Sequence, residues 1–217
     1  MSSLKLKHSG GNSVSLNPPS SAPTSSDVAF KLPNADGSAG QVLQTDGSGN
    51  LSWVTLPSAG ISMAETWRLT SNITNNGSEN VITANLSKPS TPSGYGKVGT
   101  ETMTESSGVF TFPSTGIYYI TATAKQYSLG SGTEGNGNGI YINTTTNNSS
   151  YSRASYGSQA VPTTYDYASS TCHLIFDVTD VSNYKVRFSH NGTSGSVVAG
   201  NANDNQTHFL FMKLGET

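Results

Sequence analysis

From Ala64 to Thr217 the sequence repeats one local pattern, in which short alternating runs of apolar and polar residues are separated by clusters of Gly, Asn, Ser and Pro. The runs are rich in β-branched and aromatic residues and occupy 66–73, 81–86, 109–112, 117–124, 139–142, 171–178, 184–188 and 207–212. No segment keeps the 3.6-residue period of an amphipathic helix. Many short strands with turn signals between them predict an all-β antiparallel sandwich.

Composition narrows the class of partner. Charged residues make up 11% of the 217 residues and the formal net charge is −2. A balance this close to neutral gives no electrostatic reason to expect nucleic acid or an anionic membrane. No apolar run reaches the roughly 20 residues that span a bilayer. We therefore expect neither nucleic-acid binding nor membrane insertion.

Residues 1 to about 60 differ from the rest and form a separate arm. The short alternating segments 4–6 and 14–16 precede a stiff, polar Pro/Ser-rich stretch. Asp36-Gly-Ser and Asp46-Gly-Ser follow, with the alternating run 41–44 between them and the run 51–54 after them. Asp-Gly flanked by alternating runs is a hairpin signal. Such segments are too sparse to fold alone, so we expect the arm to order against other copies or a larger partner; a floppy tail is the alternative. Its apolar docking residues are Leu4, Leu6, Val14, Leu16, Phe30, Leu32 and Trp53.

The stretch 108–124 reads Gly-Val-Phe-Thr-Phe-Pro-Ser-Thr-Gly-Ile-Tyr-Tyr-Ile-Thr-Ala-Thr-Ala. It resembles the C1q family signature of Gly-x-Phe-Thr, a Pro-containing turn and Gly-x-Tyr-Tyr. Downstream, 168–178 with 184–188 resembles the family's penultimate strand pair, and 207–214 resembles its closing strand. Over residues 64–217 the resemblance implies a jelly roll of the C1q and tumour-necrosis-factor type, usually a tight homotrimer. Two departures are Phe112, where the family often has Cys, and a long segment 143–169, interpreted as an elaborated loop.

Four aromatic residues in the resembling strands are assigned to packing, namely Tyr118, Tyr119, Phe209 and Phe211. A trimeric sandwich buries both faces of some strands, and these strands are apolar on both sides. They are therefore expected in the core and along the trimer axis.

The first 55 residues carry a second resemblance. Residues 4–19 and 31–46 are similar to the leader of fibre proteins from tailed bacteriophages, where it precedes varied C-terminal domains. The resemblance implies attachment to another virion protein through residues 1–60. The chain also combines no secretory signal at its start, a single cysteine and a surface rich in amides and hydroxyls. That combination is typical of virus structural proteins, which are assembled in a host cytoplasm and exposed on a particle.

No arrangement of residues predicts catalysis. His8, His173, His190 and His208 are scattered without metal-ligand spacing, and Cys172 lies in an apolar strand face, where a buried, inert thiol is expected. The cluster 201–205 groups oxygen ligands but contains one carboxylate, which makes a weak calcium site. The sequence thus predicts no enzyme, no metal and no cofactor, with calcium near Asn201–Asn205 as the alternative.

The resemblance to the C1q family implies that both chain ends lie at the base of the sandwich, so a binding surface is expected at the opposite end. Strand counting places four turns there, at 75–79, 113–116, 143–169 and 191–205. The receptor-binding candidates are Tyr151, Tyr156, Tyr165, Tyr167, Asn203 and Asp204. Tyr offers a large contact area with few rotors and a polar tip, which suits saccharide or protein surfaces. The alternative, that these tyrosines pack the loop onto its own sheet, stays open.

These observations predict a phage virion appendage of the tail-fibre or tail-tip type, with domains at 1–60 and 64–217. The first docks the chain to the particle, and the second binds a host-surface glycan or protein as a trimer, which multiplies weak contacts. The alternative is a head fibre or capsid decoration protein with a structural role.

Overall fold

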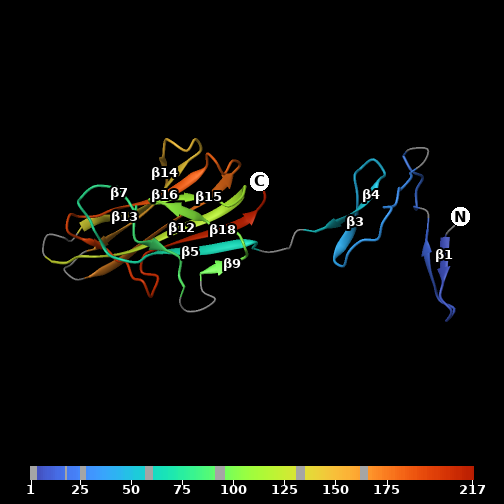
Figure 1. Ribbon diagram of the computed structural model, residues 1–217, viewed down its shortest axis with the longest axis horizontal. Helices are drawn as coiled ribbons and strands as arrows, with labels where there is room; N and C mark the ends of the chain where they lie inside the picture. The colour runs from blue at the N-terminus through green and yellow to red at the C-terminus, as the bar shows by residue number, and fades with distance from the viewer. Residues whose placement is uncertain are drawn as a thin grey trace. The chain divides into compact units, whose positions relative to one another are not determined.

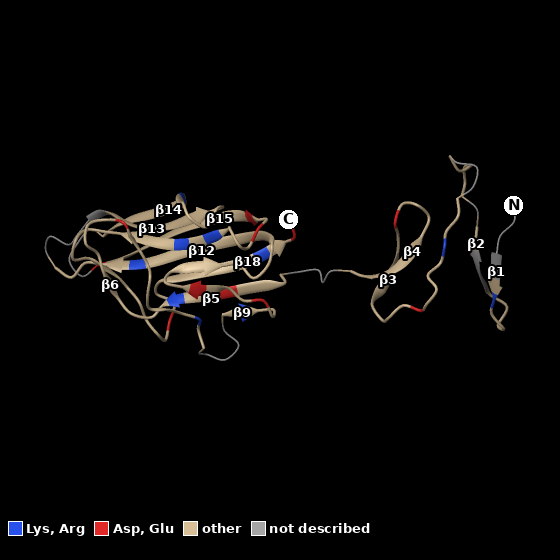
Figure 2. Cartoon of the chain, turned by 45° about the horizontal axis from the view of Figure 1, so that its top comes forward, with Lys and Arg blue, Asp and Glu red and all other residues tan. Residues whose placement is uncertain are grey.

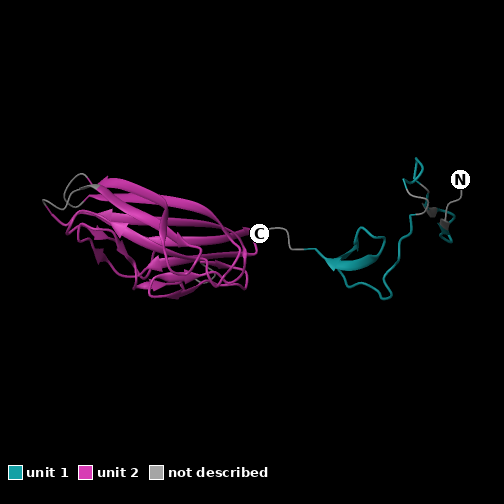
Figure 3. Cartoon of the chain, turned by 90° about the horizontal axis from the view of Figure 1, so that it is seen from above, with its two compact units in different colours: residues 1–58 teal, residues 59–217 magenta. Residues whose placement is uncertain are grey.

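The computed structural model describes residues 4–17, 19–24, 28–56, 61–90, 96–130, 135–161 and 166–217, with the backbone alone for residues 4, 5, 13–15, 135 and 136. These ranges consist of strands, turns and irregular segments (Figure 1). No helix among the described residues has the length and apolarity needed to cross a membrane. The chain divides into unit 1, residues 1–58, and unit 2, residues 59–217 (Figure 3).

The described part of unit 1 contains two antiparallel hairpins; the Asp46-Gly signal predicted the second, whereas segments 4–6 and 14–16 were expected only as strands that could pair. Strand β1 (Leu4–Lys7) pairs with β2 (Ser13–Leu16), and β3 (Gln41–Thr45) pairs with β4 (Leu51–Thr55). The Asp46 carboxylate closes the second turn by accepting hydrogen bonds from Asn50 Nδ2 at 2.6 Å and from the Ser48 backbone N–H at 2.8 Å. These bonds hold the pKa of Asp46 below its usual value.

Unit 2 contains an eight-stranded sheet built around the long strand β12 (Gly116–Tyr127). Strand β15 (Tyr167–Val178) pairs along one side of β12, and β18 (His208–Gly215) pairs along the other. Strand β5 (Met63–Leu69) pairs with the outer side of β18. Four two-residue strands extend this sheet: β6 (Ile73–Thr74), β8 (Leu86–Ser87), β9 (Lys97–Val98) and β17 (Val197–Val198).

The second sheet of unit 2 has six strands. Strand β13 (Gly135–Thr145) pairs with β14 (Ser152–Val161) on one side and with β16 (Lys185–Asn191) on the other. The opposite edge of β16 pairs with β11 (Val109–Thr111) and β7 (Asn80–Val81). Strand β10 (Thr104–Ser106) completes the sheet beside β11.

Successive strands mostly alternate between the two sheets. The chain passes from β11 in the six-stranded sheet to β12 in the eight-stranded sheet and back to β13, and it crosses again from β14 to β15 and from β15 to β16. The first long strand, β5, lies beside the last, β18. This is an antiparallel jelly roll, as the sequence predicted.

The core between the sheets is aromatic at its centre. The Phe110 ring lies 5.2 Å from Trp67 and 5.1 Å from Phe211, measured between ring centroids, and Phe188 stacks on Phe209 at 4.0 Å. All of these side chains are buried. Because they come from both sheets, their packing holds the two layers together.

The structure explains the glycines of the 108–124 signature. Gly108 has φ +83°, and a Cβ there would lie 2.1 Å from the Ile82 carbonyl oxygen. Gly116 has φ +147°, and its Cβ would lie 2.7 Å from the carbonyl oxygen of Gly215. Only glycine fits such contacts at positive φ. The Tyr118 hydroxyl donates to the Ser114 carbonyl at 2.9 Å and fixes the turn between them.

Two predictions of secondary structure, for residues 81–86 and 143–169, are wrong. The run 81–86 is not one strand, since β7 joins the six-stranded sheet, β8 joins the eight-stranded sheet and Asn85 between them has φ 60°. The segment 143–169 is not a long loop, because β13 continues to Thr145 and β14 occupies 152–161. β14 lacks an apolar face and is held instead by its ladder to β13.

The expected placement of turns is also wrong for two of the four. Ile117 pairs with Gly215, so the 113–116 turn lies at the end of the sandwich that carries the C-terminus. The turn after β13 lies at this same end, since Asn148 N–H donates to the Asn183 carbonyl in the turn that follows β15. The turns 75–79 and 191–196 bond to each other at the opposite end. Strand counting failed because β11 and β12 lie in different sheets.

A buried polar network joins those two turns. His190 Nδ1 lies 2.7 Å from Asn75 Oδ1, and Asn75 Nδ2 donates to Ser196 Oγ at 2.9 Å. Because Asn75 uses its Nδ2 as a donor to Ser196, its Oδ1 is the acceptor of the His190 Nδ1–H, which fixes the neutral tautomer. Burial lowers the pKa of His190 below its ordinary value of 6.5.

We predict that acid destabilises the sandwich through His190. As the pH falls through 6.5, the unfolded histidine takes up a proton before the folded one does, because the folded pKa is lower, so the free energy of unfolding falls as the pH falls. His190→Gln should flatten the dependence of Tm on pH between pH 7 and about 5. The control His8→Gln, in unit 1, should keep the wild-type slope. An unchanged slope in His190→Gln would contradict this account.

We predict that Phe110→Ala lowers the free energy of unfolding of unit 2 by about 3–5 kcal/mol, because it opens a cavity at the centre of the core. Urea unfolding followed by near-ultraviolet circular dichroism measures the loss. Phe30→Ala is the matched control, since its side chain is 62% exposed. Equal small losses in both variants would show that Phe110 does not join the two sheets.

Candidate functional site

The outer face of the eight-stranded sheet carries an apolar row. On β12 the core residues alternate with Ile117 and Tyr119, which lie on the outer face. Tyr119 pairs with Ile175 on β15 and with Met212 on β18, and Leu210 lies two residues before Met212 on the same face. Ile175 is 64% exposed. We call Ile117, Tyr119, Ile175, Leu210 and Met212 the apolar row.

The four packing residues expected from the sequence divide between the two faces of this sheet. Tyr118, Phe209 and Phe211 are fully buried in the core. Tyr119 points the other way, into the apolar row. β12 and β18 carry apolar residues on both faces over part of their length, whereas Thr121, Thr123 and Lys125 continue the outer face of β12. Packing of the outward residues along a trimer axis stays a prediction.

Tyr167 lies on the same outer face, toward the end opposite the C-terminus. Its ring centroid is 5.2 Å from that of Tyr127, and Lys125 Nζ lies 4.3 Å above it. The side chain is 63% exposed. Tyr167 is therefore separated by the sandwich from Tyr151 and Tyr156, with which it was grouped.

The outer face of the six-stranded sheet carries a different set of residues. Tyr141 on β13 and Tyr156 on β14 are register partners, and their rings stack at 4.8 Å with 19° between the planes. The Arg153 guanidinium lies 4.2 Å above the Tyr141 ring. This stack covers Tyr141 and leaves Tyr156 48% exposed.

Glu79 fixes the position of Arg153. Its carboxylate pairs with the Arg153 guanidinium and accepts a hydrogen bond from Ser189 Oγ at 2.6 Å. Ser189 in turn accepts from Asn143 Nδ2 at 2.5 Å. Although partial burial works against it, the Ser189 and Arg153 bonds hold the pKa of Glu79 below its usual value. Arg153 is thus held from both sides, by a ring and by a carboxylate.

Tyr151 and Arg187 form the other half of this face. The Arg187 guanidinium lies 4.1 Å from the Tyr151 ring centroid. Asn143 on β13 pairs with Arg187 on β16 and with Arg153 on β14, so it lies between the two arginines. We call Tyr141, Asn143, Tyr151, Arg153, Tyr156 and Arg187 the arginine–tyrosine face.

The remaining receptor-binding candidates lie elsewhere. Asn203 and Asp204 are exposed in the segment between β17 and β18, where Asn203 N–H donates to Asn201 Oδ1 at 2.7 Å and Asn201 Nδ2 donates to Asp204 at 3.3 Å. Tyr165 lies outside the described residues. Sequence reasoning missed Arg153, Arg187 and Tyr141, although alternation with Ile140 and Ile142 on β13 points Tyr141 outward.

The described His, Cys, Asp and Glu side chains form no reactive or metal-binding cluster. Cys172 is buried, its Sγ–H donates to the Ile140 carbonyl at 3.5 Å, and burial raises its pKa to about 11, so the thiol is an inert core residue as expected. No group of three or more His, Cys, Asp or Glu side chains that could hold a metal ion occurs in the part of the chain that the structure describes.

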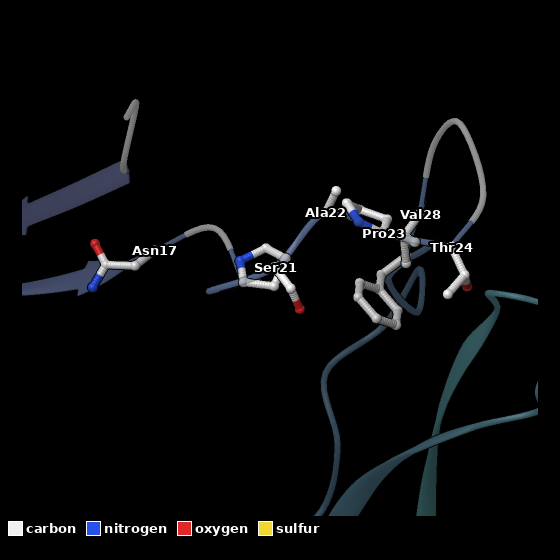
Figure 4. Close-up of a pocket in the computed structure, with 8 residues that line it drawn as sticks. Asn17, Ser21, Ala22, Pro23, Thr24 and Val28 are labelled. Carbon is white, nitrogen blue, oxygen red and sulfur yellow. The ribbon is translucent and has the colours of Figure 1, made fainter.

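Unit 1 leaves its apolar side chains uncovered. Leu6, Leu16, Phe30 and Leu32 are between 62% and 75% exposed, and the described part of the structure gives only the backbone of Leu4 and Val14. Trp53 is fixed, since its Nε1 donates to the Ala35 carbonyl at 2.9 Å and its ring lies against Gly37. An open hollow lined by Ala22, Pro23 and Val28 adds to this apolar surface (Figure 4).

Comparisons with known proteins give only distant likenesses. No protein-family model and no curated protein matches the chain. Among solved structures it is similar to murine APRIL, with 10% identity over 70% of this chain and 98% of that chain and a TM-score of 0.49. It is also similar to Eiger TNF from S. frugiperda, with 8% identity over 71% of this chain and 93% of that chain and a TM-score of 0.49. A third similar structure is PRD1 vertex protein P5, with 15% identity over 72% of this chain and 100% of that chain and a TM-score of 0.42. The jelly-roll fold of unit 2 therefore rests on its own strand order.

Proposed function

We propose that this chain is a non-enzymatic, homotrimeric appendage of a virus particle, which docks through residues 1–60 and presents its sandwich to a host-surface glycan or protein. The observation that carries the proposal is the apolar row across β15, β12 and β18, in which four side chains are half-buried and Ile175 is exposed. Burying one large apolar side chain contributes about 1.5–3 kcal/mol. A row of five such residues on one face of a sheet favours burial against other copies of the chain.

The arm supports the same proposal. Two short hairpins with largely exposed Leu and Phe side chains do not form a core of their own. Their surface fits a segment that interleaves with its copies or packs on another virion protein. A capsid decoration role uses the same arm and trimer, so the location of the protein on the particle separates the two functions.

We predict that the wild-type chain is a trimer at micromolar concentration by multi-angle light scattering, and that Leu210→Glu shifts it toward monomer, because a carboxylate would be buried in the interface. Ser158→Glu, at an exposed position on β14, is the matched control and should stay trimeric. Circular dichroism checks that both variants fold. A monomeric wild-type chain would refute the trimer.

We predict that an antibody against unit 2 labels the tail of intact particles in negative-stain electron microscopy. Labelling over the capsid would favour the decoration role instead. Particles without label, when the same antibody binds the purified protein, would contradict a virion location.

A further inference from the structure

Arg187 lies on the outer face of the six-stranded sheet, and no carboxylate among the described residues neutralises its positive charge. Its Nε is buried and has no hydrogen-bond partner among the described residues. No salt bridge to its guanidinium occurs in those residues either, and its contact there is with the Tyr151 ring. Partly buried guanidinium groups are normally paired, because loss of water is not otherwise compensated. An anion from outside the chain would pair with the terminal nitrogens of this guanidinium and neutralise its charge.

Arg153 provides the contrast. It lies on β14 across β13 from Arg187, and since neighbouring strands are about 4.8 Å apart, the two backbones are separated by about 10 Å. Glu79 already pairs with Arg153. The face therefore presents one available cation and one neutralised cation, so it suits a ligand with a single acidic group in this position.

The rest of the face is flat, aromatic and rich in hydrogen-bonding groups. Tyr156 is 48% exposed beside the Arg153 guanidinium, whose side chain is 51% exposed. An exposed tyrosine ring offers an apolar face for the C–H groups of a sugar and a hydroxyl for its edge. The stack on Tyr141 and the pairing of Arg153 hold these groups in place before a ligand arrives, which reduces the entropy lost on binding.

The charge of the face argues against strongly anionic polymers. Glu79 pairs with Arg153 there, and the whole chain has a net charge of −2. Figure 2 shows both Lys or Arg (blue) and Asp or Glu (red) on the strands of unit 2. Nucleic acids need several unpaired cations along the phosphate backbone. A saccharide that places one carboxylate on this face matches the guanidinium of Arg187, since Glu79 already pairs with that of Arg153.

We propose that the arginine–tyrosine face binds an acidic saccharide, with Arg187 pairing the carboxylate of one sugar and Tyr156 contacting the ring of a neighbouring sugar. The inference rests on the proposed function, in which the apolar row is buried between copies and this opposite face stays open. It places ligand binding on the side of the sandwich and not at its end.

Isothermal titration calorimetry with the full chain tests the site. The probes are uronic-acid hexasaccharides, namely hexagalacturonate and a hyaluronan hexasaccharide, and the neutral maltohexaose and cellohexaose. A uronic-acid probe should bind at least about ten-fold more tightly than the neutral probes, because hydrogen bonds between charged groups are the stronger ones, and added salt should weaken it. Neutral and acidic probes that bind alike, or no acidic probe that binds, would overturn the proposal. Preference for a phosphoserine peptide would overturn the ligand class.

Variants assign the binding to this face. Arg187→Gln should weaken acidic-saccharide binding by about ten-fold or more, and Tyr156→Ala should weaken acidic and neutral sugars alike. Lys97→Gln removes an equal charge from an exposed position in the other sheet and should bind as the wild type does. Arg187→Gln with wild-type affinity would refute the site.

Light scattering on the same samples separates failure of this inference from failure of the proposed function. A trimer that binds no acidic saccharide contradicts the site and leaves the trimeric appendage standing. A monomer that binds acidic saccharide through Arg187 contradicts the trimer and leaves the site standing.

Discussion

Strand β12 places apolar side chains on both of its faces, and the rest of the molecule depends on this arrangement. Its inward residues, among them Tyr118 and Ile120, pack in the core between the sheets. Its outward residues Ile117 and Tyr119 face away from the core. A single sandwich can bury one face of each sheet, so the inward set stabilises the fold. The outward set is the surface that we propose to be buried against other copies of the chain.

The two sheets consequently have different outer faces. The eight-stranded sheet presents the apolar row, whereas the six-stranded sheet presents arginines, tyrosines and amides held by hydrogen bonds and ring contacts. A jelly roll that associates through one sheet leaves the other exposed. In our proposal, assembly and recognition therefore use opposite faces of unit 2, and the exposed leucines of unit 1 serve for docking.

The sequence predicts most of the strands because alternation and β-branched content follow directly from burial of one face. The signature glycines also have a local cause, since Gly108 and Gly116 need positive φ beside a carbonyl oxygen. Strand β14 was missed because Ser, Gly and Tyr alternate there without an apolar face, and only its ladder to β13 makes it a strand. The grouping of Tyr151 and Tyr156 with Tyr167 failed for a related reason. The register that places the first two on one sheet and Tyr167 on the other is a property of long-range pairing.

The central claim is that the outer face of β12 and β18 is buried between copies while the outer face of β14 stays in water. Hydroxyl-radical footprinting of the intact chain at micromolar concentration, read out by mass spectrometry, measures both faces in one experiment. The account predicts slow oxidation of Tyr119 and Met212 and fast oxidation of Tyr156, with Met212 becoming reactive on dilution below the trimer's dissociation constant. Oxidation of Met212 and Tyr119 as fast as that of Tyr156 at every concentration would contradict it.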